Sequence, residues 1–429
     1  METEWITDQS RECISCGWKL NDPDVLIGDQ LPSAIFLNIE STELQELRAS
    51  SLDLCQCSNP ECSLVQLKTQ INMDIVYKHY PYQSGTTATM RSILSDVVDE
   101  ALERVQLSPN DVVLDIGGND GSLLNCISHK LRARVNIDIA DGIEQIEMGD
   151  DYIYVNSKFS KNEYLKLELP KPRIIFCTAV FYQLQDPKMF CENIREIMDG
   201  QSLFIMQMTY LGSMFENNIY DNIVHEHAAY YSLFSLNSLL VSCGLKLVGV
   251  RIVQSYGGSM RVYITRDDSK TDCSKFRFDI DEIRRNELSE GVNSATALRK
   301  FGAEFKVWQK SARDLIDLQF LKDGPIVGMG ASTKGNMMLQ ALGIDSRVMP
   351  FIMDNNRKKI GMKTTGSNIP IVDERSITTL PTNILILPYY YRDFFMRKIE
   401  SEIQAGQKIN IIDILPMPNV TELRGQAGE

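Results

Sequence analysis

Apolar runs of strand length alternate with helical patterns between about residue 88 and residue 265. Four of these runs are almost continuous: DVVLDIGG (111–118), ARVNIDIA (133–140), RIIFCTAV (173–180) and QSLFIMQM (201–208). Such runs are typical of buried strands in a parallel sheet. The alternation predicts a doubly wound α/β domain, and two later patterns, LKLVGVRIVQ (245–254) and MRVYITR (260–266), predict its last strands.

The same alternation returns in the last quarter of the chain. PIVGMGASTKGNMMLQALG (325–343) predicts a strand, a glycine turn and a helix. Further buried strands are predicted for VMPFIMDNN (348–356), NILILPYY (383–390) and KINIIDI (408–414). Residues 280–320 predict long helices that bridge the two units. We therefore expect a cysteine-rich domain at 1–75, an α/β domain at 76–275 and a C-terminal α/β domain at 276–429.

The turn after the first strand of the larger α/β domain predicts a cofactor site. Its candidate residues form one motif: Asp115, Gly117, Asn119, Gly121 and Leu123. Glycines let the backbone approach a ligand that a Cβ would exclude. Asp138 ends the second strand, where an acid suits the hydroxyls of a ribose. The spacing lacks the G-x-G-x-x-G of a dinucleotide site, and the alternative to a cofactor site is an ordinary glycine turn.

Composition and charge argue against two classes of protein, general nucleic-acid-binding proteins and membrane proteins. The chain has 429 residues, a formal net charge of −13 and 43% hydrophobic residues, as expected for a globular protein. The acidic balance argues against general binding of nucleic acid. No apolar run approaches the length of a membrane span, and the N-terminus lacks a signal pattern, so we expect no membrane contact and a cytoplasmic location. No coiled coil is predicted, and a monomer is expected.

Five of the ten cysteines lie within the first 62 residues. Cys13 and Cys16 have the spacing of a zinc knuckle, and the CSNPEC segment supplies Cys57 and Cys62. Cys55 is an alternative ligand to Cys57. Four thiolates form a closed tetrahedral site, so we predict a structural Zn²⁺ without a catalytic role. The alternative is a set of unligated cysteines.

The segment DNIVHEHAAYYSL (221–233) contains two of the four histidines in the chain. On an extended segment His225 and His227 would share one face, and Glu226 would point away. Three interpretations are open: a metal site that needs further ligands, a hydrogen-bonded structural pair, and a general base. A neutral imidazole near pH 7 is suited to take a proton from an activated carbon.

Three further segments carry candidate ligands for a substrate. Tyr80–Thr86 combines phenols, hydroxyls and a glycine, and is either a substrate-contacting lid or an aromatic linker. The turn at 256–261 ends in Arg261, which is suited to a phosphate or a sugar hydroxyl, although a plain hairpin is the alternative. Lys334 lies where a helix begins and is suited to an anion. Its loop is neither a Walker A motif nor a strict dinucleotide fingerprint.

Together these segments resemble the sugar C-methyltransferase family, whose enzymes act on nucleotide-linked keto-sugars, and its C-3 methyltransferases of deoxysugar biosynthesis in particular. The resemblance extends over nearly the whole chain, and its motifs occur in the family's order. They are CxxCG at Cys13–Gly17, C-x-LVQL at Cys62–Leu67, Y-x-Y-x-S-[SG] at Tyr80–Gly85, [DE]-I-G-S-N-D-G-x-L-L at Asp115–Leu124, HEH at His225–His227, GGS-[LM]-RV at Gly257–Val262, G-x-G-A-x-x-K-G-N at Gly328–Asn336, and D-N-x-x-x-K-x-G with a later I-P-I at Asp354–Ile371.

The resemblance implies a fold, two cofactors and a set of roles. The fold is a class I methyltransferase Rossmann-like domain between a small zinc-binding domain and a C-terminal Rossmann-like domain. The cofactors are S-adenosylmethionine (SAM) and structural Zn²⁺, and the substrate is a dTDP- or GDP-linked 4-keto-hexose. His227 would be the base, and His225, Glu226, Tyr82 and Gln183 would assist it. Further substrate contacts are expected from Tyr80, Ser84, Arg261, Lys334 and Asn336.

Three departures from the family pattern alter helper groups near the expected site. Val224 replaces a tyrosine before HEH, Gln183 stands in the segment where the family carries a histidine, and Tyr256 replaces the histidine before GGS. Other activities compatible with the residues are methyl transfer to nitrogen or oxygen, a non-enzymatic zinc- and nucleotide-binding protein, and an HxH metal hydrolase.

Overall fold

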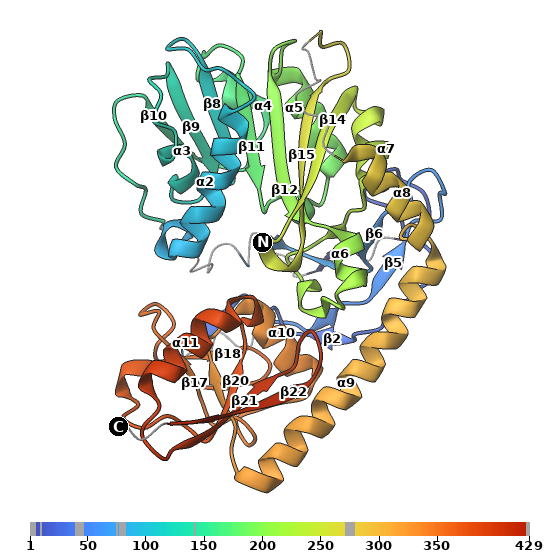
Figure 1. The fold of residues 1–429 in the computed structure, drawn as a ribbon. Coiled ribbons are helices and arrows are strands. Elements are labelled where there is room, and N and C mark those ends of the chain that lie inside the picture. Colours follow the sequence, from blue (N-terminus) through green and yellow to red (C-terminus); the bar gives the residue numbers. More distant parts are fainter. Residues whose placement is uncertain are drawn as a thin grey trace.

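A computed structural model describes residues 6–8, 11–38, 47–73, 76, 83–140, 143–270 and 279–425. Two α/β units follow a small N-terminal module. In Figure 1 the first unit occupies the upper half of the view and the C-terminal unit the lower half. The predicted α/β class is confirmed.

The first unit is built on a seven-stranded sheet in the order β10-β9-β8-β11-β12-β15-β14. The strands from β10 to β12 are parallel, and β15 runs antiparallel between β12 and β14. Their bounds are β8 (Val112–Ile116), β9 (Ala133–Asp138), β10 (Tyr152–Asn156), β11 (Ile174–Thr178), β12 (Leu203–Thr209), β14 (Leu245–Val253) and β15 (Ser259–Arg266). Every strand predicted for this unit is present. Strand β10 was not predicted; it is a half-buried edge strand whose hydrophobic run, YIYV, is only four residues long.

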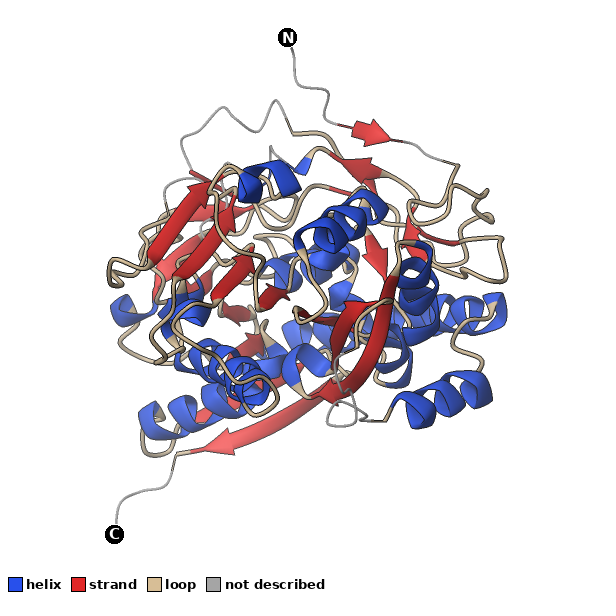
Figure 2. Cartoon of the chain, turned by 90° about the horizontal axis from the view of Figure 1, so that it is seen from above, coloured by secondary structure: helices blue, strands red, loops and turns tan. Residues whose placement is uncertain are grey.

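Successive side chains of a strand point to opposite faces, so the sheet has two separate cores. Val113 and Phe176 pack in the core that contains α2 and α3, whereas Leu114 and Cys177 pack with α5 and α7. Helices therefore cover both faces, as the view from above also shows (Figure 2). The helices are α2 (Ala88–Leu102), α3 (Ser122–Asn125), α4 (Lys161–Leu165), α5 (Pro187–Ile197), α6 (Leu211–Glu216) and α7 (Leu233–Ser242).

The C-terminal unit has a six-stranded sheet in the order β19-β17-β16-β20-β21-β22. All neighbours are parallel except the last pair, so the strand order is that of a doubly wound dinucleotide-binding fold. Its elements are β16 (Val327–Met329), α10 (Thr333–Ala341), β17 (Ile352–Asp354), β18 (Met362–Thr364), β19 (Ile371–Asp373), β20 (Asn383–Ile386), α11 (Arg392–Glu402), β21 (Lys408–Asp413) and β22 (Asn419–Arg424). Ligands of such sheets bind where the strand order reverses, here beyond β16 and β20.

Helices α8 (Ile280–Glu290) and α9 (Ala295–Asp323) connect the two units, but they do not both belong to the second one. Glu287 of α8 accepts hydrogen bonds from the backbone N–H groups of Leu233 and Phe234 at the start of α7. Helix α8 therefore packs on the first unit, although the predicted boundary lies at 276. Helix α9 runs along one side of the molecule to the C-terminal unit (Figure 1). Within the described residues, no helix is both long enough and apolar enough to cross a bilayer.

The N-terminal module pairs with both α/β units. It contains β1 (Ile6–Asp8), β2 (Asp29–Gln30), β3 (Phe36–Asn38), β4 (Ser50–Ser51), β5 (Leu54–Gln56), β6 (Val65–Leu67) and β7 (Gln70–Ile71). Strand β6 pairs with β13 (Ala229–Tyr230) of the first unit, and β3 pairs with β18 of the C-terminal unit. The module also contacts α9 closely, because a Cβ at Gly302 would lie 2.4 Å from the carbonyl oxygen of Asp24.

Candidate active site

A cavity of about 870 Å³ lies between the two α/β units. On one side it is lined by the glycine loop after β8 and by the end of β9. On the other side it is lined by the first turn of α10 and by the ends of β17 and β20, with the HEH segment between the two sides. The carboxyl ends of both parallel sheets therefore open into the same space, where ligands of such folds bind.

The glycine loop has the conformation that its sequence requires. Gly117, Asn119 and Gly121 all have positive φ angles, of 69°, 53° and 84°. A Cβ at Gly117 would lie 2.3 Å from Cγ2 of Val180, so no other residue fits there. Asparagine is among the residues that adopt a left-handed conformation most readily, which explains why Asn119 can occupy the place of a glycine. Gly117, Asn119 and Leu123 line the cavity, whereas Gly121 makes room for the ring of Tyr152 behind the loop.

Asp138 fixes the glycine loop from the end of β9. Its Oδ2 accepts a hydrogen bond of 2.8 Å from the backbone N–H of Asn119, and its Oδ1 accepts one of 2.7 Å from Ala140. Burial raises the pKa of this carboxyl, and the two backbone donors counteract that effect. Each carboxylate oxygen keeps a second lone pair, so Asp138 can still accept a ribose hydroxyl from the cavity that it lines.

We expect Asp138→Ala to weaken SAM binding about tenfold to a hundredfold, because it removes a charged acceptor that contributes about 1.5–3 kcal/mol. Titration calorimetry measures the loss. Asp354→Ala is the matched control: Asp354 ends β17 and accepts the Ala331 N–H in the same manner, but in the C-terminal unit. Equal losses of affinity in both variants would contradict a ribose contact at Asp138.

Asp115, at the end of β8, is a buried carboxyl without a hydrogen-bond partner at Oδ2. Burial raises its pKa to about 8, and the neighbouring carboxyls of Asp138 and Asp120 add to the effect. It lines the cavity, so a cation bound there would stabilise the ionised form.

We therefore expect SAM, which carries a sulfonium and an ammonium group, to bind more tightly as the pH rises from 6 to 8. Below a pKa of about 8, binding must displace the proton of Asp115, which lowers affinity up to about tenfold per pH unit. Calorimetry at three pH values measures the slope, and Asp115→Asn should flatten it. A slope that persists in Asp115→Asn would assign the proton to another group.

The HEH segment is a turn, so the extended geometry in which the two imidazoles would share one face does not apply. The backbone N–H of His227 donates to the carbonyl of Val224, which turns the two imidazoles apart. Nε2 of His225 lies 3.1 Å from the carbonyl oxygen of Ser50 in the N-terminal module, and His225 does not line the cavity. Among the described residues, the two histidines form no cluster with other metal ligands, so an HxH metal site finds no support.

His227 faces the cavity in a single tautomeric form. Its Nδ1 lies 2.7 Å from the backbone carbonyl of Asn222, and a carbonyl can only accept. Nδ1 therefore carries the proton, and Nε2 has the lone pair of a base. Burial lowers the pKa of His227 to about 3, and the positive charge of Lys334 contributes in the same direction. The imidazole is thus neutral at physiological pH.

Glu226 and Gln183 line the same cavity. Oε2 of Glu226 is buried without a hydrogen-bond partner, and burial raises the pKa of the carboxyl to about 7. The Gln183 side chain donates to the carbonyl of Ala179 at 3.0 Å. Ser84 also lines the cavity, but on the cofactor side, where its N–H donates to Oδ1 of Asn119. Tyr80 and Tyr82 lie outside the described residues.

Two predicted substrate ligands have packing roles instead. Arg261 is almost completely buried in β15 and forms ion pairs with Glu100 and Asp96 of α2. Asn336 is also buried, and its amide is held by Ser33 and Thr365. Neither side chain lines the cavity, because the polar atoms of each are bonded to other residues inside the protein.

The sequence prediction missed several polar residues at the cavity. Asp221, Thr209 and Tyr390 all line it, and Tyr182 contacts His227 with ring centroids 4.1 Å apart. Thr209 ends β12, and Tyr390 closely follows β20. Attention to the carboxyl ends of the predicted strands would have found both.

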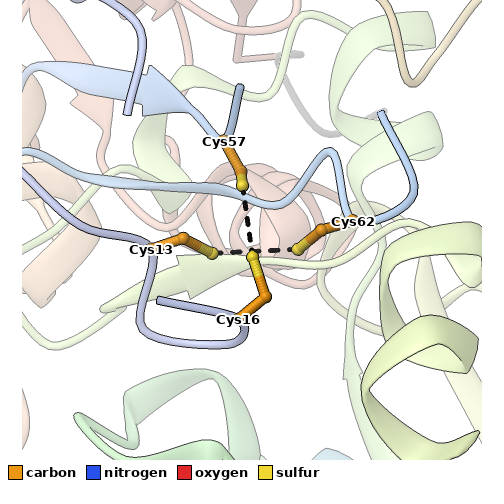
Figure 3. A group of neighbouring side chains, drawn as sticks. All are labelled: Cys13, Cys16, Cys57 and Cys62. Atoms are coloured by element: carbon orange, nitrogen blue, oxygen red, sulfur yellow. Dashed lines mark hydrogen bonds between the residues drawn. The ribbon is translucent and has the colours of Figure 1, made fainter. Parts of the chain in front are cut away.

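The cysteine cluster lies in the N-terminal module, away from this cavity. Cys13, Cys16, Cys57 and Cys62 point their sulfurs toward one another (Figure 3), and all four sulfurs lie within 4.8 Å. Two of the separations are 3.5 and 3.8 Å. A tetrahedral Zn²⁺ with bonds of about 2.3 Å requires edges of about 3.8 Å, so the four thiols fit this ion. Cys55 is buried outside the cluster, which selects Cys57 as the ligand.

Comparisons with known proteins agree with this arrangement. A methyltransferase domain family matches residues 87–250, and a C-methyltransferase C-terminal domain family matches residues 254–416. C-methyltransferase NovU of Streptomyces niveus is 25% identical over 370 residues, which are 86% of either chain. A probable ribosomal RNA small subunit methyltransferase A of Pyrococcus abyssi is 27% identical over 121 residues, 27% of this chain and 44% of the relative.

Two solved structures match less than half of this chain. A chain in the complex between the Haloferax volcanii Trm112 methyltransferase activator and the putative methyltransferase has a TM-score of 0.35 and 14% sequence identity to this chain. The match covers 42% of this chain and 92% of that chain. The plantazolicin methyltransferase BamL has a TM-score of 0.34 and 14% identity, and covers 43% of this chain and 87% of its own.

Proposed function

The chain is a SAM-dependent C-methyltransferase that fits the sugar C-methyltransferase family, and from this premise we propose that it methylates C3 of a 4-keto-hexose linked to a nucleoside diphosphate. The observation that carries the proposal is the neutral His227, which lies in the cavity wall between the cofactor loop and the C-terminal unit. Methyl transfer to carbon requires a base, whereas transfer to an amine or a hydroxyl needs little more than an oriented nucleophile.

In this proposal the C-terminal unit holds the nucleoside diphosphate. Ser332 and Thr333 line the cavity at the start of α10, where backbone N–H groups and the helix dipole favour an anion. Asp354 and Lys359 hold the turn before α10 in place. Asp354 accepts a hydrogen bond from the backbone N–H of Ala331, and Lys359 donates one to the backbone carbonyl of Ala331. The diphosphate would lie on this turn and place the sugar toward His227.

The proposed reaction begins with proton transfer to His227. The ketone acidifies the neighbouring C3–H, and Nε2 of His227 takes that proton while the electron pair moves into an enolate. When bound, SAM would supply an electrophilic methyl group: the enolate carbon would form a bond to it as the S–CH₃ bond breaks, the ketone would reform, and S-adenosylhomocysteine would leave. His227 returns to its neutral form when Nε2 releases the proton to water. General-base catalysis of this kind contributes about 10²–10⁴-fold to the rate.

Other residues would hold the substrate oxygen and exclude water. Glu226, whose pKa near 7 allows it to be protonated, would donate a hydrogen bond to the enolate oxygen. Gln183 would contact the keto oxygen in place of the histidine of the family. Tyr82 would orient the sugar, as the resemblance implies. We also propose that the four-cysteine cluster binds structural Zn²⁺, since its sulfurs fit a tetrahedral ion.

The test is incubation with methyl-labelled SAM and a panel of dTDP- and GDP-linked 4-keto-sugars, followed by NMR of the product. The proposal expects the label on C3. It also expects deuterium from the solvent to enter C3 when the enzyme and sugar are mixed without SAM. Label on an oxygen or nitrogen, with no solvent exchange, would replace this proposal with an O- or N-methyltransferase.

A further inference from the structure

Lys334 belongs to the C-terminal unit but reaches the catalytic turn of the first unit. It lies in the first turn of α10, and its Nζ donates a hydrogen bond to Oδ1 of Asn222 in η4 (Tyr220–Asn222). The ammonium lies 4.5 Å from the centre of the Tyr390 ring. Tyr390 in turn donates a hydrogen bond of 2.9 Å to Asp221. A cation, an aromatic ring and a carboxylate thus meet beside the HEH turn.

Asn222 connects this cation to the imidazole of His227. Its side chain accepts from Lys334, while its backbone carbonyl accepts from Nδ1 of His227 at 2.7 Å and from the Tyr230 hydroxyl at 3.3 Å. The Asn222 side chain and backbone belong to one residue, so the hydrogen bond from Lys334 restrains the carbonyl that selects the tautomer of His227. The same hydrogen bond joins the C-terminal unit to the first unit.

Charged and titratable groups of several elements surround the catalytic turn. Lys334 of α10 acts on His227 electrostatically, and the rings of Tyr182 in η3 (Phe181–Gln183) and Tyr230 in β13 lie next to its imidazole. Asp221 of η4, Glu226 of the turn and Tyr390 of η8 (Tyr389–Tyr391) line the same cavity. Lys334 is the cation in this set. Burial raises the pKa of Asp221, and Lys334 opposes that rise, so the two form a charge-balanced pair.

We propose that Lys334 is a positioning residue for the base: through Asn222 it holds His227 as the Nδ1–H tautomer, with the lone pair of Nε2 in the cavity. This proposal rests on the proposed function, in which His227 removes the C3 proton. It also gives the C-terminal unit a part in proton transfer, beyond binding of the nucleotide.

Histidine NMR tests the proposal without a substrate, because the chain has only four histidines. In ¹⁵N-histidine-labelled full-length enzyme, the signal lost in His227→Asn identifies the residue. We expect that signal to report one Nδ1–H tautomer from pH 6 to pH 8. Lys334→Met should convert it to a mixture of tautomers and raise the pKa of His227, because a nearby positive charge is removed. Lys334→Arg, which keeps the charge, should restore a single tautomer.

The matched control is Lys359→Met, which removes another half-buried lysine of the same cavity, bonded to Ala331 instead of Asn222. It should leave the His227 signal unchanged, and thermal melts would show whether both methionine variants are folded. In turnover measured with methyl-labelled SAM, Lys334→Met should lower kcat at least about tenfold, with a smaller change in KM for the sugar nucleotide.

The results separate the two proposals. An inactive His227→Asn together with an unchanged His227 signal in Lys334→Met would overturn the role of Lys334 and leave the base intact. A rise in KM alone for Lys334→Met would likewise assign the lysine to substrate binding. An active His227→Asn would overturn the proposed function itself, and the positioning role with it.

Discussion

His227→Asn is expected to reduce turnover about 10²–10⁴-fold while the affinity for SAM stays within about twofold of the parent. Asparagine can still donate a hydrogen bond to the Asn222 carbonyl that Nδ1 of His227 contacts, so the turn should persist. It has no nitrogen lone pair able to accept a proton at neutral pH. Single-turnover kinetics and calorimetric titration of SAM measure the two quantities separately.

His225→Asn is the matched control for this result. The side chain lies two residues away and is just as buried, but its Nε2 contacts the Ser50 carbonyl and not the cavity. We expect turnover within about tenfold of the parent, because asparagine can donate to the same carbonyl. If both variants lost activity equally, the loss would reflect damage to the turn. If His227→Asn turned over like the parent, another group would be the base.

The sequence was informative where a local pattern determines the structure. The glycine loop and the acid at the end of β9 depend on residues close together in the chain, whereas the strand order of the two sheets depends on distant residues and was not predicted. The four cysteines were also predictable, since their short spacings are those of metal-binding turns. Asn119 shows why the loop could be identified without its middle glycine: asparagine tolerates the positive φ that the turn requires.

The errors arose where partners lie far apart in the sequence. Arg261 has the local context of an anion-binding turn, but Glu100, which neutralises it, lies 161 residues earlier. Asn336 likewise bonds to Ser33 across 303 residues. The alternation of side chains along an extended segment does not describe HEH, because contacts with the N-terminal module determine the backbone conformation there. Leu67 of β6 donates to the carbonyl of Ala228, so pairing begins only after the two histidines, and the preceding residues form a turn.

Removal of the metal is expected to have the second large effect. In Cys57→Ser we expect bound zinc to fall from about one ion per chain to near zero, because three thiolates no longer close a tetrahedral site. Structural zinc contributes about 10–16 kcal/mol of apparent binding energy in zinc-finger peptides, and this energy is folding energy. Metal analysis and thermal melting measure the loss. Cys55→Ser is the matched control, since Cys55 is buried two residues away but outside the cluster.

We expect the loss of zinc to lower turnover as well, because the cysteine-containing segment supports strands that lie next to the HEH turn. Cys62 is followed by β6, which pairs with β13 directly after the HEH turn, and Ser50 contacts His225. We therefore expect Cys57→Ser to lose most of its turnover even at temperatures where the larger sheet is still folded. The glycine loop and Asp138 lie in that sheet, so SAM should bind with an affinity within about tenfold of the parent. Full turnover in a zinc-free, folded variant would show that the catalytic turn does not depend on this module.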